Sequence, residues 1–124
     1  DETLGVVYAG FVAKAMQRPE GLARVRALFK GWLSWSEKAG LKGGCPIAAG
    51  MFERDDLPED DPVRKRLVES EENWRHLLID TVKEAVDRSE LRSDLDVAQF
   101  VWELSGIYLT HHVSHRFLKD SKAT

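Results

Sequence analysis

Apolar and polar residues follow one another along this chain with the three- and four-residue spacing of α-helices, and few positions interrupt the pattern. The interruptions are Pro19, the glycine-rich stretch 40–44 and the acidic stretch 55–61. The pattern therefore predicts an all-α fold, a five-helix bundle. The expected helices cover approximately residues 3–17, 19–38, 46–54, 62–89 and 94–119.

Residues with strong positional preferences predict where several of these helices begin and end. Pro19 is expected to end the first helix, because the residue before a proline disfavours helical backbone, and to start the second. Asp61 is expected to cap the long helix that begins at Pro62. Ser93 or Asp94 is expected to cap the last helix.

The last two helices differ from helix 19–38, which has a single apolar face, because each of them has two. On helix 62–89 the first apolar row is Val63, Leu67, Trp74, Leu78, Thr81 and Ala85, and the second is Val68, Ile79, Val82 and Val86. On the last helix the two apolar rows are Val97, Phe100, Leu104, Ile107 and Tyr108, and Ala98, Trp102, Leu109 and Val113. Five helices are too few to cover both faces, so we expect a homodimer in which these helices and their copies form a four-helix bundle. The pattern leaves open which face of the last helix meets the partner. The expected dimer contacts are Val82, Val86, Trp102, Ser105, Leu109, His112 and Val113.

Composition and charge narrow the class of protein. The chain has 124 residues, 43% of them hydrophobic, which is enough for one domain with one core. Its formal net charge is −3 and it has no basic stripe, unlike a module that holds DNA through phosphates. The single cysteine excludes an internal disulfide and fits a reducing cytoplasm. No apolar run approaches the roughly 20 residues of a membrane span, so we expect a cytoplasmic protein without membrane contact.

Two segments carry a resemblance to a known family. One is GGCPIAAGMFERDD at 43–56, and the other is ELSGIYLTHH at 103–112. DPVR at 61–64 lies between them, and Arg116 follows them. In this order the motifs are similar to the effector-binding and dimerisation half of TetR-type bacterial transcriptional regulators.

The resemblance implies a regulatory function. In such repressors a small effector binds inside the helical domain and changes the spacing of two DNA-reading heads in the dimer. Those heads belong to an N-terminal helix-turn-helix domain, which this chain lacks. Because the chain begins at Asp1 without an initiating methionine, we expect a fragment that meets DNA only through that domain. Residues 1–124 are expected to form one effector-binding and dimerisation domain.

Aromatic residues suggest where an effector binds. Four tryptophans and five phenylalanines are many for this length, although core packing is the usual role of such residues. The TetR resemblance favours a largely apolar cavity for a small lipophilic or aromatic effector. Met51 and Phe52 lie on the short third helix, which we expect to act as an adjustable lid. The expected ligand-binding residues are Phe11, Phe29, Trp32, Met51, Phe52, Trp74, Leu78 and His111.

Other candidate chemistry is incomplete. His111 and His115 share a helical face, but no nearby carboxylate or cysteine completes a metal site, so no metal is expected. Cys45 precedes a helix N-terminus, where a thiol can be activated, although a small buried residue is the simpler interpretation. No nucleophile–base pattern and no phosphate-binding glycine loop is present, so neither an enzyme nor a cofactor is expected. Two alternative classes stay open. One is a helical dimerisation or interaction module without a ligand, and the other is a small helical enzyme or metal carrier.

Overall fold

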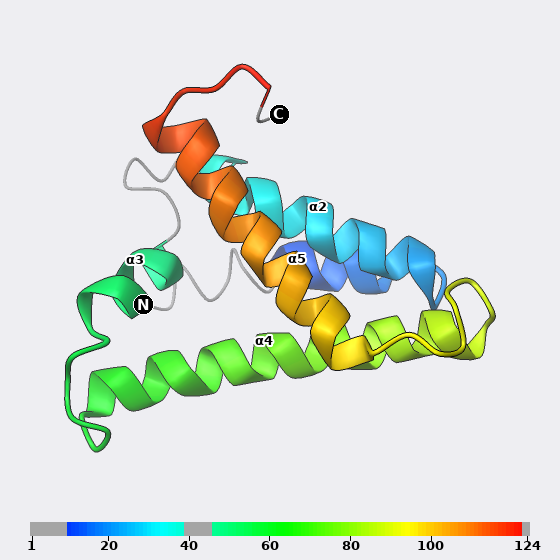
Figure 1. The fold of residues 1–124 in the computed structure, drawn as a ribbon, viewed down its shortest axis with the longest axis horizontal. Coiled ribbons are helices and arrows are strands. Elements are labelled where there is room, and N and C mark those ends of the chain that lie inside the picture. Colours follow the sequence, from blue (N-terminus) through cyan, green and yellow to red (C-terminus); the bar gives the residue numbers. More distant parts are fainter. Residues whose placement is uncertain (1–9, 39–45, 123–124) are drawn as a thin grey trace.

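The computed structural model describes residues 10–38 and 46–122, and every regular element within these segments is a helix. The all-α prediction is therefore confirmed, while Cys45 lies outside the described residues. Among the described helices, none is both long enough and apolar enough to cross a bilayer. After the end of a first helix at residues 10–16, the elements are α2 (Leu22–Lys38), α3 (Pro46–Glu53), α4 (Pro62–Asp87), α5 (Val97–His112) and the π-helix η1 (Val113–Phe117), which continues α5 (Figure 1).

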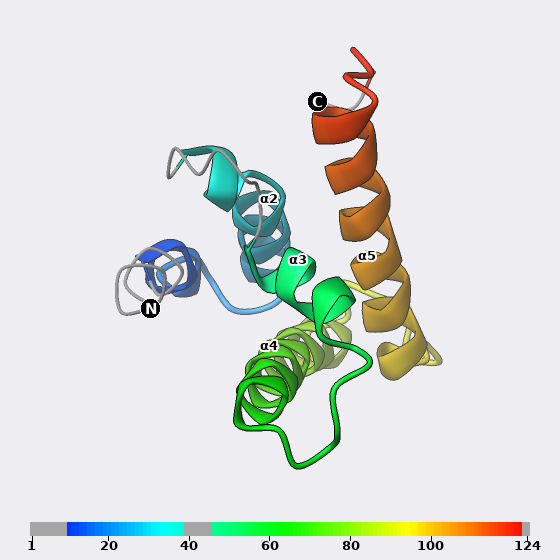
Figure 2. The ribbon, with the colours of Figure 1, turned by 90° about the vertical axis from the view of Figure 1, so that its left-hand side faces the viewer.

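The helices cross rather than run parallel. The long helix α4 lies along one side of the molecule, and α5 runs obliquely away from it, so that the N-terminal end of α5 lies beside α4 (Figure 1). α2 packs against both α4 and α5, and the short α3 packs against α4. Viewed along α4, the first helix and α5 lie on opposite sides of α2 (Figure 2). α5 is therefore an edge helix, and among the described helices none packs against its side away from α2 and α4.

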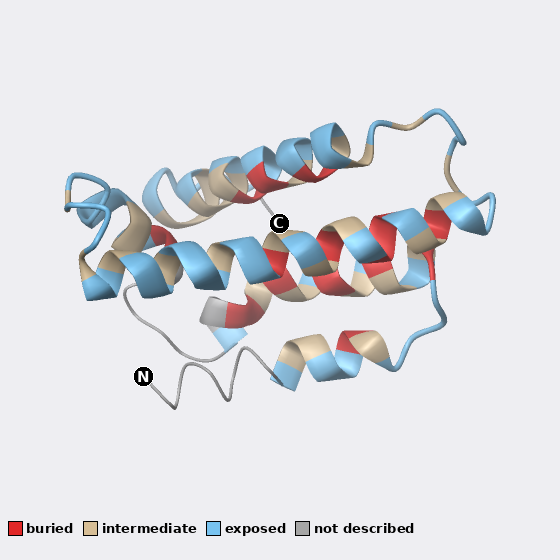
Figure 3. Ribbon diagram, turned by 90° about the horizontal axis from the view of Figure 1, so that it is seen from below, coloured by how far each residue is buried: buried red, intermediate tan, exposed pale blue. Residues whose placement is uncertain are grey.

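The hydrophobic core lies where α2, α4 and α5 face one another (Figure 3). Leu28 of α2 and Leu78 of α4 have no exposed surface. The predicted apolar row of α4 supplies most of its buried residues, which are Trp74, Leu78, Thr81, Val82 and Ala85. Val82 belongs to the second predicted row and is also fully buried. The C-terminal half of α4 therefore buries residues of both predicted rows in the core.

Two buried hydroxyl groups are satisfied within their own helices. Thr81 Oγ1 donates to the carbonyl oxygen of Leu77 at 2.7 Å, and Ser105 Oγ donates to that of Val101 at 3.0 Å. Because each hydroxyl bonds to the carbonyl four residues earlier, neither leaves an unmade hydrogen bond in the core. These small polar residues therefore allow close helix contact without a desolvation penalty.

The predicted start of α4 is confirmed. Asp61 Oδ1 accepts hydrogen bonds from the backbone N–H groups of Val63 at 2.9 Å and Arg64 at 3.0 Å, and Pro62 occupies the first turn. Such a cap satisfies donors that have no partner inside the helix. The helix ends at Asp87, two residues before the expected position.

The predicted cap of α5, Ser93 or Asp94, is wrong by three or two residues. Asp96, and not Ser93 or Asp94, precedes the helix, and its carboxylate accepts a hydrogen bond from Gln99 N at 3.1 Å. Asp94 instead lies 3.7 Å from Arg92 in an exposed ion pair. In the turn before α5, Asp94 therefore pairs with Arg92, and Asp96 caps the helix.

The predicted start of α2 at Pro19 is also wrong, because Gly21 interrupts the helix. Gly21 has a φ of 96°, a left-handed conformation that L-residues rarely adopt. A side chain there would collide with Glu90, whose carboxylate accepts a hydrogen bond from Leu22 N at 3.2 Å. α2 therefore begins at Leu22, where a residue from the α4–α5 loop supplies the cap.

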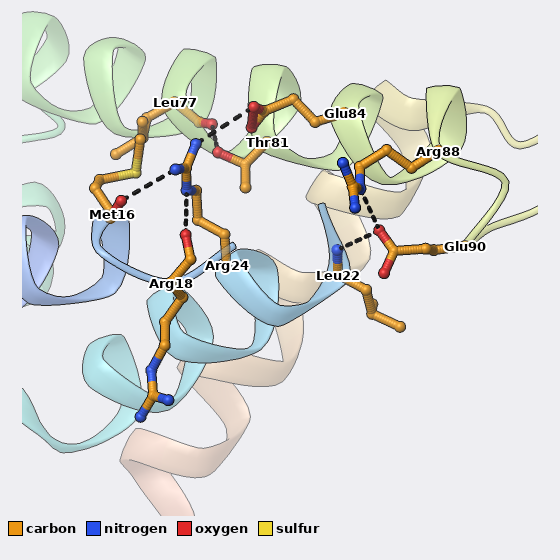
Figure 4. A network of polar contacts seen from close by, with 9 residues as sticks. All are labelled: Met16, Arg18, Leu22, Arg24, Leu77, Thr81, Glu84, Arg88 and Glu90. Atoms are coloured by element: carbon orange, nitrogen blue, oxygen red, sulfur yellow. Dashed lines mark hydrogen bonds and ion pairs between the residues drawn. The ribbon is translucent and has the colours of Figure 1, made fainter. Parts of the chain in front are cut away.

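A second polar link joins the end of the first helix to α4 (Figure 4). The Arg24 guanidinium donates to the carbonyl oxygens of Met16 at 3.0 Å and Arg18 at 3.3 Å. It also forms an ion pair with Glu84 at 3.4 Å. The Arg24 side chain of α2 thereby connects the end of the first helix to α4.

Candidate functional site

Aromatic rings from four helices meet at the centre of the molecule. The Trp32 indole of α2 stacks on the Tyr108 ring of α5, with centroids 4.3 Å apart and planes inclined by 9°. Trp74 of α4 meets the same indole edge to face at 5.1 Å. Phe11 of the first helix makes an edge contact with Trp74 at 5.9 Å and a stacked contact with Trp35 at 6.5 Å. Both arrangements are favoured between aromatic rings, so the cluster fixes the relative positions of these helices.

A cavity of about 50 Å³ lies beside this cluster, among α2, α3, α4 and α5. Its wall is mainly aromatic and aliphatic, and its charged groups, Glu71 and Arg75, are paired through a 3.0 Å hydrogen bond. The lining residues are Trp32, Trp35, Ala48, Met51, Ser70, Glu71, Trp74, Arg75, Ser105, Tyr108 and Leu109. Ligand sites usually measure roughly 300–1,000 Å³, so a ligand larger than a small apolar group requires side chains to move.

The uncovered side of α5 carries a strip of apolar surface. Trp102 is 63% exposed and Val113 is 51% exposed, although both are hydrophobic. Gly106 lies between them, and apart from its two chain neighbours and the backbone of its own helix, no described atom comes within 4 Å of the position that its Cβ would occupy. The spacing of four and seven residues places all three on one helical face. We call Trp102 and Gly106 of α5, together with Val113 at the start of η1, the α5 outer strip.

A histidine cluster lies at the C-terminal end of α5. His112 stacks on Tyr108 with centroids 6.0 Å apart, and His111 stacks on His115 at 5.5 Å. Partial burial, and then the charges of Arg116, His111 and His115, lower the pKa of His112 below its ordinary value of 6.5. The part of the chain that the structure describes has no group of three or more histidine, cysteine or carboxylate side chains suited to a metal ion.

Comparison with protein families identifies the domain. The family described as Tetracyclin repressor-like, C-terminal domain matches residues 21–124, which include every wall of the aromatic cavity and the α5 outer strip. The chain belongs to this family. TetR C-terminal domains are regulatory rather than enzymatic, and they typically dimerise and bind effectors. A comparison with curated proteins found no significant match.

The TetR-type domain brings together part of the predicted ligand-binding set. Trp32, Met51 and Trp74 line the cavity. Phe52 does not, because it is 66% exposed. Adjacent residues of a helix point about 100° apart, so α3 can turn Met51 inward only by turning Phe52 toward solvent. His111 lies in a shallow surface depression beside the C-terminal half of α5 and away from the cavity.

Three further predicted residues support the cavity without lining it. Leu78 is fully buried in the core. Phe11 and Phe29 are partly buried and pack against Trp74 and Trp32, respectively. They stand behind the wall rings, so a ligand role for them requires the cavity to open beyond its present size.

The predicted dimer contacts divide into exposed and buried residues. Trp102 and Val113 lie on the α5 outer strip, and Val86 and His112 are partly exposed. Val82 has no exposed surface and lies in the core of a single chain. Its expected place at a dimer contact is therefore corrected, because α2 and α5 already cover that face of α4.

The apolar pattern singled out only part of the face of α5 that meets the core. The buried residues of α5 are Val101, Ser105 and Tyr108, of which Tyr108 belongs to the first predicted row, whereas Val101 and Ser105 lie between the two rows. Ser105 and Leu109 were predicted as dimer contacts, but they line the cavity, and Ser105 is only 6% exposed. Val101, Ser105 and Tyr108 are spaced by four and three residues, which places them on one helical face. This spacing was the signal in the sequence that could have identified Tyr108 as a residue of the cavity wall.

Proposed function

We propose that this chain is the effector-binding and dimerisation domain of a TetR-type repressor, with residues 1–124 forming one regulatory unit. Family membership supports this proposal, and so does the aromatic cavity among four helices. In this proposal a helix-turn-helix domain outside the chain contacts the operator. The net charge of −3 and the acidic stretch 55–61 suit a domain that does not touch phosphates.

The proposed effector is small and largely apolar. Its binding favours a conformation in which Met51 moves and the cavity enlarges, and this change alters the spacing of the two DNA-reading heads. The observation that carries the proposal is the cavity wall formed by Trp32, Trp74 and Tyr108. A neutral probe such as 4-phenylbutan-1-ol should change tryptophan emission and raise the melting temperature. Saturation at a hundredfold excess over the dissociation constant adds about 2.7 kcal/mol of stability.

A matched pair of variants tests the position of the effector. Ala48 is buried and lines the cavity, whereas Ala49 is the next residue of α3 and is exposed. Ala48→Leu should fill the cavity and weaken probe binding, and Ala49→Leu should leave binding unchanged. Equal binding by both variants would place the effector elsewhere.

A module without a ligand is the second candidate, favoured by one observation. The 4.3 Å stack of Trp32 on Tyr108 and the 50 Å³ volume leave little room beside the rings. Under this alternative the cavity is a packing defect, and Ala48→Leu should raise the melting temperature. Apolar probes should then leave tryptophan emission unchanged up to their solubility limit.

The proposed homodimer forms through the α5 outer strip. The exposed Trp102 and the open space around Gly106 support it, because a glycine allows the helices of two copies to approach closely. Trp102→Glu should convert the dimer to a monomer in light scattering, because it buries an unpaired charge. Phe52→Glu is the matched control, since Phe52 is similarly exposed but lies on α3. A wild-type monomer at micromolar concentration, or a dimer that survives Trp102→Glu, would contradict this interface.

A further inference from the structure

A second hollow adjoins the aromatic cavity. It is a groove of about 290 Å³ between the end of α3 and the N-terminal half of α4. The cavity and the groove share Met51, Glu71 and Arg75 as lining residues. The groove combines apolar side chains, including Leu67 and Val68, with three arginines and three carboxylates. An elongated molecule can therefore occupy both spaces if Met51 moves aside.

The close contact between α3 and α4 defines the partition between the two hollows. Gly50 of α3 lies so close to α4 that a Cβ at this position would be 3.3 Å from Leu67 Cδ2. Met51 follows directly and contributes to both linings. A methionine side chain has three rotatable bonds and adapts its shape readily. It can therefore open a passage without displacing the helices.

The charged groups of the groove are not all paired. Arg75 Nε donates to Glu71 at 3.0 Å. Arg64 Nε is buried and has no hydrogen-bond acceptor within the described residues, and its side chain forms no ion pair there. Buried donors in native proteins nearly always have an acceptor, so this one is open to an acceptor that the described residues do not supply.

The character of that acceptor follows from the surroundings. A guanidinium presents parallel N–H groups that match the two oxygens of a carboxylate. Asp55 and Glu72 also line the groove and repel a second negative charge. A phosphate monoester carries about 1.5 to 2 negative charges, so a singly charged carboxylate suits the groove better.

We propose that the effector is an organic carboxylate that spans both hollows. Its apolar body passes Met51 toward Trp32 and Trp74, and its carboxylate accepts hydrogen bonds from Arg64 in the groove. This assignment rests on the effector-binding role proposed above. It makes Arg64 the residue that selects an acid over its neutral analogue.

Two probes that differ only in charge test the assignment on the full 124-residue chain. They are 4-phenylbutanoate and 4-phenylbutanamide, titrated while tryptophan emission and heat of binding are recorded. The acid should bind about tenfold more tightly than the amide, a difference of about 1.4 kcal/mol. Arg64→Gln should abolish that preference and leave the affinity for the amide unchanged. Arg66→Gln is the control, because Arg66 is exposed on the same helix and lies outside the groove lining.

The outcomes separate the carboxylate site from the cavity. Equal affinity for the two probes, or a preference that survives Arg64→Gln, overturns the carboxylate site and leaves the apolar effector site standing. Loss of the preference in Arg66→Gln as well overturns the specific role of Arg64, because a general charge effect would then explain it. Failure of both probes to bind at millimolar concentration overturns the carboxylate site and the proposed effector cavity together.

Discussion

The indole of Trp32 lies parallel to the phenol ring of Tyr108, with 4.3 Å between the ring centroids. This stack joins α2 to α5 and forms part of the cavity wall. We expect Tyr108→Ala to lower the free energy of unfolding by about 3–5 kcal/mol, because it removes a buried ring. Tyr108→Phe keeps the ring and should have a much smaller effect. Urea unfolding at a fixed protein concentration measures both, and equal losses would assign the stabilisation to the hydroxyl group.

The Arg24 network predicts unequal effects for its two charged partners. Arg24 binds two backbone carbonyl oxygens as well as Glu84, whereas Glu84 meets only Arg24 in the network of Figure 4. Arg24→Ala should therefore cost about 1.5–3 kcal/mol of stability, and Glu84→Gln less than about 1 kcal/mol. Unfolding of both single variants and the double variant gives the coupling between them. Similar losses from both single changes would contradict the role of the carbonyl contacts.

Two glycines should respond in opposite directions to replacement by alanine. Gly21→Ala forces a φ of 96° on an L-residue and displaces the Glu90 cap, so we expect it to destabilise the domain by roughly 2 kcal/mol. Gly10 lies in the first helix with open space around it, and Gly10→Ala should stabilise by about 0.5–1 kcal/mol. Thermal unfolding of the two variants in the same buffer measures the difference. A stabilising Gly21→Ala would show that the turn has another accessible conformation.

His112 should make stability depend on pH. Burial and the neighbouring positive charges lower its pKa in the folded state below 6.5, so the unfolded chain binds the proton more readily. The stabilising contribution of the neutral imidazole is present above about pH 6.5 and is lost as the pH falls through the folded pKa. Between about pH 7.5 and 5.5 we therefore expect the melting temperature of the wild type to fall more than that of His112→Gln.

An exposed histidine provides the control for that prediction. His76 is exposed on α4, away from the cluster at the end of α5. His76→Gln should retain the wild-type fall in melting temperature. If His112→Gln shows the same pH profile as His76→Gln, the dependence arises from other groups.

The sequence by itself determined the helical class and the features that depend on one or two turns of chain. Asp61 and Pro62 mark the start of α4 because a cap satisfies the first N–H groups of its own helix. Trp74, Leu78 and Ala85 recur at helical spacing, and this part of their row is buried as the pattern predicts, whereas Val63 at the start of the row is exposed. The motifs at 43–56 and 103–112 also led to the correct family.

Only the tertiary structure decided what each face meets. Periodicity requires an apolar row to be covered, but it does not say whether the core or a second copy covers it. Ser105 therefore proved to face the cavity, while Trp102, on the same helix, remains exposed. The start of α2 could not be predicted from neighbouring residues, because the Glu90 carboxylate that caps Leu22 lies 68 residues away in the sequence. Local chemistry determines where helices form, whereas contacts between distant segments determine which surfaces are left to bind an effector or a partner.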